Sequence, residues 1–285
     1  GSCTDLLATV SYPLRRMYGD SYRVAPLSVL VDPHRAARVL GLEEGPAFSP
    51  KVRYVYEKQL EEADLIVVNK IDLVDRPFRE RLEGALRRAF PQAEVLACSA
   101  RGGEGLAPWF ERLLAAEAAE RPTMAVDYDE YAEGEALLGW LNCTVAVTAR
   151  RPFDANALLL ELAHAIQARL RDRGREIAHL KMTLDARDDA GHLAVVSLVA
   201  SEGPPDVRES LLDEVDGGSL VVNLRAEADP EELRAVTDEC LAAAWAARPY
   251  DTAALEHAEH FRPGRPVPVH RMTVAASPDA GGGRV

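Results

Sequence analysis

The chain has 285 residues, of which 47% are apolar and 28% are charged, and its formal net charge is −13 at pH 7. This length allows one large hydrophobic core or two modest ones, and we expect two domains. The negative charge repels phosphate groups at long range, which argues against nucleic acid or an anionic membrane surface as a partner. The sequence has no apolar stretch of membrane-spanning length and no signal-peptide pattern. We therefore expect a cytoplasmic protein with no membrane partner.

The four cysteines do not indicate a disulfide framework or a thiolate zinc site, because no Cys-x-x-Cys pair occurs. They are spread along the chain at Cys3, Cys98, Cys143 and Cys240. We expect reduced thiols that are mostly buried.

The first part of the chain alternates short apolar runs with segments of helical spacing. Strands are predicted at residues 26–31, 63–68 and 94–98, and helices at residues 52–62, 76–90 and 106–116. Strands that alternate with helices of about ten or more residues indicate a parallel sheet with helices on both faces.

The alternation ends at residues 120–135, where Arg121-Pro122 and a run of acidic residues and tyrosines predict a linker. Asp229 is expected to cap a later helix, with Pro230 at its first position and Glu232 three residues after the cap. This helix belongs to a β-α-β-β-β-α order, which predicts helices packed on a mainly antiparallel sheet. The strands are predicted at 141–148, 177–184, 193–200 and 219–225, and the helices at 154–172 and 230–247.

These patterns divide the chain into four parts. An α/β domain is expected at residues 1–119, a linker at 120–135, a smaller α+β domain at 136–250 and a tail at 251–285. The tail is rich in Pro, Gly and Arg, and we expect roughly its last ten residues to be disordered.

The strongest candidate site is the sequence Asn69-Lys70-Ile71-Asp72, here called the NKID loop, directly after the predicted strand 63–68. Ligands of open α/β sheets bind at the carboxyl ends of the strands. There, the Asp72 carboxylate can accept hydrogen bonds from N1–H and the 2-amino group of guanine, which adenine does not offer. Asn69 is expected to hold the base edge and the adjoining loop, and the stem of Lys70 to lie along the base or ribose.

A second candidate loop follows the next predicted strand. It reads Cys98-Ser99-Ala100-Arg101 and is here called the Ser-Ala loop. Ser99 is expected to brace the NKID loop, the Ala100 N–H to donate to guanine O6, and Cys98 to pack in the core. The competing interpretation of residues 69–72 is a plain turn before a helix. Two loops on successive strands favour base recognition.

The NKID and Ser-Ala loops, the lead-in at residues 59–64 (QLEEAD) and a second domain entered through Asp127-Tyr128 and Gly134-Glu135 together resemble the CobW-like family. These are P-loop GTPases linked to metal-cofactor delivery, in a wider group with the nickel-insertion GTPases of urease and hydrogenase maturation. The resemblance covers most of residues 1–270 and is looser in the second domain, where the layout matches. It implies a partial P-loop GTPase-type parallel sheet with flanking helices, followed by a smaller α+β domain.

The sequence also departs from the family pattern. A complete member begins with a Gly-x-x-x-x-Gly-Lys-Ser/Thr loop that binds the phosphates and, through Ser or Thr, Mg²⁺. That pattern does not occur here, and no lysine follows a glycine. The family's Walker B acidic residue and cysteine-rich metal motif also lie upstream of the matched region. Because residues 1–5 resemble the segment after the family's second strand, we expect a chain that begins within the nucleotide-binding domain.

The resemblance implies an intact protein that binds GTP or GDP with Mg²⁺, hydrolyses GTP and delivers Zn²⁺ or another divalent metal to a metalloprotein client. This chain is expected to supply guanine recognition and the second domain, without a catalytic residue of its own. The alternative is a degenerate domain that does not hydrolyse GTP and serves as a protein-interaction module. Retention of Asp72 and the Ser-Ala loop favours the first interpretation. The sequence does not indicate an oligomeric state.

One weak metal candidate lies in the predicted tail. His257 and His260 would lie on one face if residues 257–260 were helical, and two imidazoles can bind a divalent metal. An exposed polar helix end with incidental histidines is the favoured interpretation.

Overall fold

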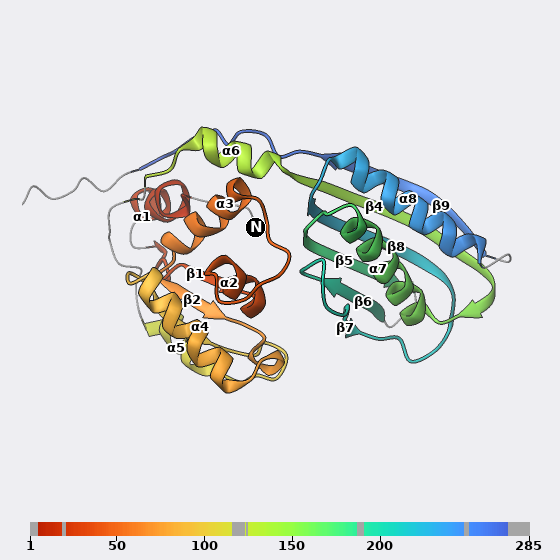
Figure 1. Ribbon diagram of the computed structural model, residues 1–285, viewed down its shortest axis with the longest axis horizontal. Helices are drawn as coiled ribbons and strands as arrows, with labels where there is room; N and C mark the ends of the chain where they lie inside the picture. Colours follow the sequence, from red (N-terminus) through yellow and green to blue (C-terminus); the bar gives the residue numbers. More distant parts are fainter. Residues whose placement is uncertain are drawn as a thin grey trace, which may run out of the picture. The chain divides into compact units, whose positions relative to one another are not determined.

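The computed structural model describes residues 5–18, 21–115, 123, 125–186, 191–247 and 251–272 (Figure 1). It divides the chain into two compact units. Unit 1 comprises Gly1–Tyr131 and Arg265–Val285, and unit 2 comprises Ala132–Gly264. Residues 1–4, most of the first part of the expected linker and the end of the expected tail lie outside the described residues.

Unit 1 is built on a three-stranded sheet in the order β1-β2-β3, and both strand pairs are parallel. The strands are Ser28–Val31, Leu65–Val68 and Glu94–Ala97, each within one of the three predicted runs. Helices α3, α4 and α5 also lie where the sequence predicts them, whereas α1 and α2 were not predicted. The helices are α1 (Tyr12–Tyr18), α2 (Pro33–Val39), α3 (Pro50–Glu61), α4 (Arg76–Ala89) and α5 (Leu106–Ala115), with a π-helical turn at Leu7–Ser11.

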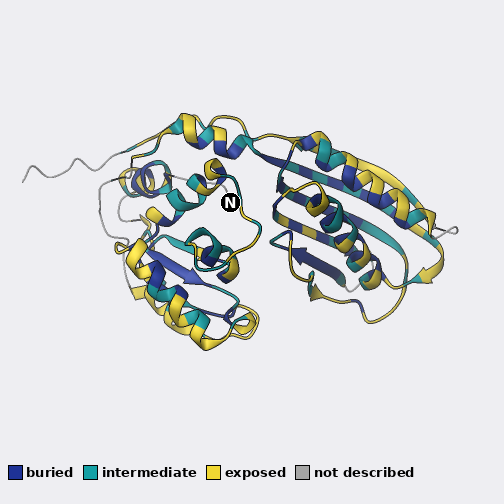
Figure 2. Cartoon of the chain, in the orientation of Figure 1, coloured by how far each residue is buried: buried dark blue, intermediate teal, exposed yellow. Residues whose placement is uncertain are grey.

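The central strand β2 is buried on both faces, as its unbroken Leu-Ile-Val-Val sequence predicts. Ile66 and Val68 belong to a core that also contains Leu82 and Leu86 of α4. Leu65 and Val67 belong to a smaller core that includes Trp109 of α5. Alternate residues of β2 therefore pack against helices on opposite faces, which confirms the predicted α/β layering. Figure 2 colours the chain by burial and shows the buried sheet of this unit between more exposed helices.

Unit 2 is a six-stranded antiparallel sheet in the order β7-β6-β5-β8-β4-β9. Helices α7 (Ala155–Asp172) and α8 (Pro230–Ala246) pack on one face, with leucine and valine side chains of β4, β5 and β8. The predicted α+β arrangement is confirmed. The strands are β4 (Leu138–Phe153), β5 (Ile177–Asp185), β6 (Leu193–Leu198), β7 (Asp206–Glu209), β8 (Val215–Glu227) and β9 (Asp251–Phe261).

The start of α8 follows the predicted capping chemistry only in part. The Asp229 side chain accepts a hydrogen bond from the Glu231 N–H at 2.9 Å, and Pro230 occupies the first turn. Glu232 instead forms a two-pronged ion pair with Arg175, at 2.9 and 3.2 Å.

Two segments differ from the sequence expectations. Residues 128–135 of the expected linker belong to helix α6 (Tyr128–Ala136), at whose start the Asp127 side chain accepts from the N–H groups of Asp129 and Glu130. Residues 251–261 of the expected tail form β9, which pairs with β4 along its length. No helix among the described residues is long and apolar enough to cross a lipid bilayer.

Candidate functional site

The two candidate loops lie side by side in unit 1. The NKID loop follows β2 and the Ser-Ala loop follows β3, and the two strands are parallel neighbours. Their carboxyl ends therefore meet at one edge of the sheet. The Ile71 N–H donates to the Cys98 carbonyl at 3.3 Å, which joins the loops directly.

Asn69 connects the ends of all three strands of this sheet. Its backbone N–H donates to the Val31 carbonyl at the end of β1, at 3.0 Å. Its side-chain Oδ1 accepts from the Lys70 N–H at 2.8 Å and from the Ala100 N–H at 3.0 Å. The geometry therefore gives Asn69 a part in holding the adjoining loop.

The Ala100 N–H is engaged by Asn69 in this structure. A backbone N–H has a single hydrogen to donate. Donation from Ala100 to a base oxygen therefore requires the Ala100 N–H to exchange Asn69 Oδ1 for that oxygen.

Lys70 has a left-handed backbone, with φ of 61°, and its side chain turns toward the end of β1. Its Nζ lies 3.1 Å from Asp32 Oδ2, and both side chains are less than one-fifth exposed. Asp32 Oδ1 also accepts from the Arg35 N–H and so caps α2. The Lys70 ammonium is thereby anchored at the end of β1.

Asp32 is a member of this cluster that the sequence analysis did not assign to the site. Its position carried a usable signal. Asp32 follows β1 directly, just as Asn69 follows β2, and polar residues at carboxyl ends of neighbouring parallel strands lie at one edge.

Asp72 lies in the short 3₁₀ turn Ile71–Leu73, whose buried residue Ile71 fixes the turn to the core. Asp72 itself is exposed, as is Arg101 of the Ser-Ala loop. The carboxylate expected to recognise guanine is therefore on the solvent side of the loop.

The Ser-Ala loop is held by Ser99, which is only 1% exposed. Ser99 Oγ accepts from the Gly102 N–H at 3.0 Å, and its backbone N–H donates to the Glu104 carbonyl at 2.8 Å. These bonds brace the Ser-Ala loop itself, whereas its contacts with the NKID loop are made through Cys98 and Ala100.

Gly105 closes this loop against the end of β3. Its φ is +73°, and a Cβ there would lie 2.1 Å from the Ala97 carbonyl oxygen. No side chain fits at that distance, so the return of the chain depends on glycine.

Cys98 behaves as a core residue, as expected. It is fully buried, and burial raises the pKa of its thiol, which therefore stays protonated at neutral pH. Its Sγ lies 3.6 Å from Asn69 Oδ1. Cys98 thus supports the NKID loop by packing.

Two acidic residues of the lead-in at residues 59–64 hold other segments in place. The Glu62 side chain is 3% exposed and accepts from the Leu7 N–H at 2.6 Å. Asp64 accepts from the Leu27 N–H at 2.7 Å. These carboxylates position the chain before β1 and at the start of unit 1, away from the candidate loops.

The helical arrangement expected for the weak metal candidate is wrong, because His257 and His260 lie in strand β9. Residues three apart on a strand point to opposite faces. His260 Nε2 lies 2.9 Å from Glu231 of α8, and His257 Nε2 lies 3.3 Å from Glu259. Among the residues that the structure describes, no group of three or more His, Cys, Asp or Glu side chains is arranged to hold a metal.

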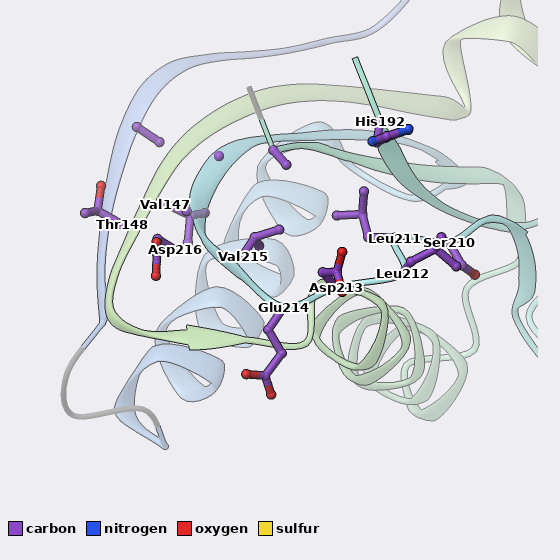
Figure 3. A pocket seen from close by; sticks show the side chains of 14 residues that line it. Val147, Thr148, His192, Ser210, Leu211, Leu212, Asp213, Glu214, Val215 and Asp216 are labelled. Atoms are coloured by element: carbon purple, nitrogen blue, oxygen red, sulfur yellow. The ribbon is translucent and has the colours of Figure 1, made fainter. Parts of the chain in front are cut away.

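Unit 2 contains a separate pocket of about 610 Å³ near the ends of β4 and β8. Its lining includes His192 and the carboxylates of Asp213, Glu214 and Asp216. Figure 3 shows these carboxylates well apart, with that of Glu214 directed away from the others. They do not converge on one point, so the pocket lacks the geometry of a cation site.

The candidate loops present a carboxylate and a backbone N–H at one sheet edge, and neither loop contains a phosphate-binding sequence. The carboxylate of Asp72 is exposed, and the two loops are joined by hydrogen bonds. The sequence contains no glycine-rich loop with a following lysine for the phosphates.

Residues 7–97 match the family model of the CobW/HypB/UreG nucleotide-binding domain. The match confirms the resemblance to CobW-like P-loop GTPases over a segment that includes the NKID loop. Similar solved structures include the Zn(II)-bound YjiA GTPase from E. coli and a Zn(II)-bound triple mutant of the YjiA GTPase. Each is 15% identical over 82% of this chain and 67% of that chain, with a TM-score of 0.28, so they support no further argument. No curated protein sequence matches the chain.

Proposed function

We propose that unit 1 recognises guanine nucleotides through the NKID and Ser-Ala loops. We further propose that the intact protein hydrolyses GTP in metal chaperoning or metal-cofactor insertion. The match of residues 7–97 to a nucleotide-binding family supports the first part. The second part includes GTP hydrolysis, a metal cargo and a metalloprotein client. It rests on the chemistry of the family.

The observation that carries the proposal is the hydrogen bond from the Ala100 N–H to Asn69 Oδ1, at 3.0 Å. It connects two loops that are 31 residues apart in sequence and follow neighbouring parallel strands. A plain turn after β2 has no need of this second loop. The shared hydrogen bond therefore favours one composite site over two unrelated turns.

Base selection follows from the donors and acceptors that guanine presents. The Asp72 carboxylate accepts from N1–H and the 2-amino group, and the Ala100 N–H donates to O6. Adenine has an unprotonated N1 and an amino group at position 6, so it would leave both protein groups unpaired. The hydrogen bonds that adenine cannot make with these two groups are worth about 1–3 kcal/mol each.

Hydrolysis requires groups beyond these loops. Mg²⁺ and a P-loop supply the charge stabilisation and positioning for phosphoryl transfer in this class. The loops described here orient the base, and we expect this chain alone to hydrolyse GTP at the uncatalysed rate. A GTPase activity of the purified chain above background would contradict this division of roles.

The test is a competition between nucleosides observed by ligand-detected NMR, which also reports weak binding. Guanosine should bind the chain and adenosine should not. In Asp72→Asn, the side-chain amide can donate to the 2-oxo group of xanthine while its oxygen accepts from N1–H. The variant should therefore shift preference from guanosine to xanthosine, by about 1–3 kcal/mol.

Asp75→Asn is the matched control for this change. Asp75 is exposed three residues further on and caps α4 through the Phe78 N–H at 2.8 Å, a role that Asn also performs. Its base preference should equal that of the unchanged chain. Equal binding of guanosine and adenosine, or an unchanged preference in Asp72→Asn, would remove the NKID loop from base recognition.

The alternative function, a non-hydrolysing interaction module, predicts that the gene encodes no phosphate-binding loop upstream of residue 1. A Gly-x-x-x-x-Gly-Lys-Ser/Thr sequence in frame upstream of residue 1 supports the GTPase proposal. An authentic start codon near residue 1 favours the interaction module.

A further inference from the structure

Strand β9 is an exposed edge of the unit 2 sheet, next to β4 (Figure 1). Within the described part of the chain, no strand pairs with its outer side. It is 11 residues long, and its apolar residues Leu255 and Phe261 are 49% and 42% exposed. An exposed edge of this length is a template for pairing with a further strand.

The sequence of this edge is complementary to itself. Residues 255–261 read Leu-Glu-His-Ala-Glu-His-Phe, with Ala258 at the centre. If two copies pair antiparallel about a twofold axis at Ala258, every histidine lies opposite a glutamate. The pairs are His257 with Glu259, Glu256 with His260, and Leu255 with Phe261 of the second copy.

The two central pairs are placed to meet. His257 and Glu259 lie on one face of β9, with 3.3 Å between His257 Nε2 and Glu259 Oε1. Their side chains are 60% and 62% exposed. Directly opposite residues in an antiparallel pair have Cβ atoms about 4.5–5.5 Å apart, so each imidazole would contact a carboxylate of the second copy. The twofold axis therefore brings together two imidazoles and two carboxylates, with each imidazole beside a carboxylate of the other copy.

Neighbouring registers lose this complementarity. An axis at His257 places that imidazole opposite itself, and an axis at Glu259 does the same for the carboxylate. A parallel pair in register places each glutamate beside its own copy. The axis at His257 loses the His–Glu pairs, and the arrangements that set glutamate against glutamate also oppose like charges, so the sequence favours the register centred on Ala258.

An irregularity limits the length of the pairing. His257 lies opposite Thr144 and Leu255 opposite Val145, so the register between β9 and β4 shifts at Glu256. Residues 257–261 on the other side of the shift form a regular strand that contains the axis and both central pairs.

We propose that the β9 edge is an interface between two copies of this chain, in which the strands pair antiparallel about Ala258. The unit 2 sheets of the two copies then form one continuous sheet. This interface is independent of nucleotide binding, because every residue in it belongs to unit 2.

The test is sedimentation velocity of the full chain from low to high micromolar concentration. The unchanged chain should reach twice the monomer mass. His257→Glu should place glutamate opposite glutamate at both central positions, and Glu259→Lys should place lysine opposite histidine. Each variant should weaken the dimer by about tenfold or more.

Mixing the two variants provides the sharpest result. In the mixed dimer, the glutamate introduced at position 257 of one copy would face the lysine introduced at position 259 of the other. The unchanged Glu259 of the first copy would face the unchanged His257 of the second. The mixture should therefore recover the dimer that each variant loses alone, which a general loss of folding cannot produce.

Glu209→Lys is the matched control. It makes the same charge change as Glu259→Lys, on the exposed residue that ends the opposite edge strand, β7. It should dimerise like the unchanged chain. A monomer at every concentration would overturn the proposal and leave the edge for a strand of another protein. A dimer that survives both single variants, or that mixing fails to restore, would also overturn it.

Discussion

Lys70 and Asp32 form an ion pair across the carboxyl ends of two neighbouring parallel strands, with 3.1 Å between Nζ and Oδ2. The side chains are 17% and 19% exposed, so solvent screens this pair less than a surface pair. The same Asp32 carboxylate caps α2, while the Lys70 backbone follows Asn69 in the NKID loop. The pair therefore connects the candidate base-reading loop to the helix after β1.

We expect this ion pair to stabilise unit 1 measurably. A double-mutant cycle of Asp32→Asn and Lys70→Met keeps the capping oxygen and the aliphatic stem while it removes both charges. The coupling energy should be about 1 kcal/mol or more from denaturant unfolding. The same cycle on the Arg76–Glu80 pair, which is 80% and 57% exposed, should give a smaller coupling. Equal couplings would show that the buried position adds nothing.

The Ser-Ala loop should depend on Gly105 more than on its neighbour Gly103. Both have positive φ, at +73° and +81°, but only a Cβ at Gly105 would meet backbone, 2.1 Å from the Ala97 oxygen. Gly103→Ala should cost about 1–2 kcal/mol of backbone strain. Gly105→Ala should cost about 3 kcal/mol or more, because the strain and the clash add. Denaturant titration measures both, and equal losses would contradict the close approach.

The sequence predicted the parallel sheet because its signals are local. Residues 65–68 are four consecutive buried apolar residues, and each predicted strand is followed by turn chemistry or a helix with its own spacing. The NKID and Ser-Ala loops were located by the same means, as polar sequences directly after strands. Their roles in base recognition stay predictions.

Features that depend on distant residues were not predicted. The chain from Leu255 to Phe261 contains alanine and glutamate, and its histidines recur at helical spacing, so its strand conformation is set by pairing with β4. Similarly, the place of Asp32 after a predicted strand indicates its sheet edge, but its neighbours in sequence do not identify Lys70, 38 residues away, as its partner. Asp229 was predicted correctly because a cap is read from its neighbours, but its partner Arg262 was not.

Asp229 should give unit 2 a pH dependence at the acidic end. The hydrogen bond from Arg262, at 2.6 Å, holds the pKa of Asp229 below its ordinary value of 3.8, and the Glu231 N–H adds to the effect. A depressed pKa contributes stability that is present above the ordinary value and is lost as the pH falls through the folded value. In Arg262→Gln, the pKa of Asp229 should rise toward 3.8, as measured by NMR titration. An unchanged pKa would mean that Arg262 does not act on the carboxylate in solution.

The Glu135–Arg225 pair should show the cost of leaving a buried charge without its ion-pair partner. Arg225 Nη2 lies 2.9 Å from Glu135 Oε2, and the Glu135 side chain is 3% exposed. The Arg225 guanidinium also lies over the Trp140 ring, 4.5 Å from its centroid. Arg225→Met keeps apolar contact with Trp140 but removes the cation, and it should lower the free energy of unfolding by about 3–5 kcal/mol.

The decisive comparison is with the double variant Glu135→Gln/Arg225→Met. Removing both charges avoids an isolated carboxylate in the interior, so the double variant should be more stable than Arg225→Met alone. This order is the reverse of what two independent, additive losses would give. Denaturant unfolding of the unchanged chain, of Arg225→Met and of the double variant measures this order of stability directly. A double variant less stable than Arg225→Met would mean that the Glu135 carboxylate is stabilised without Arg225.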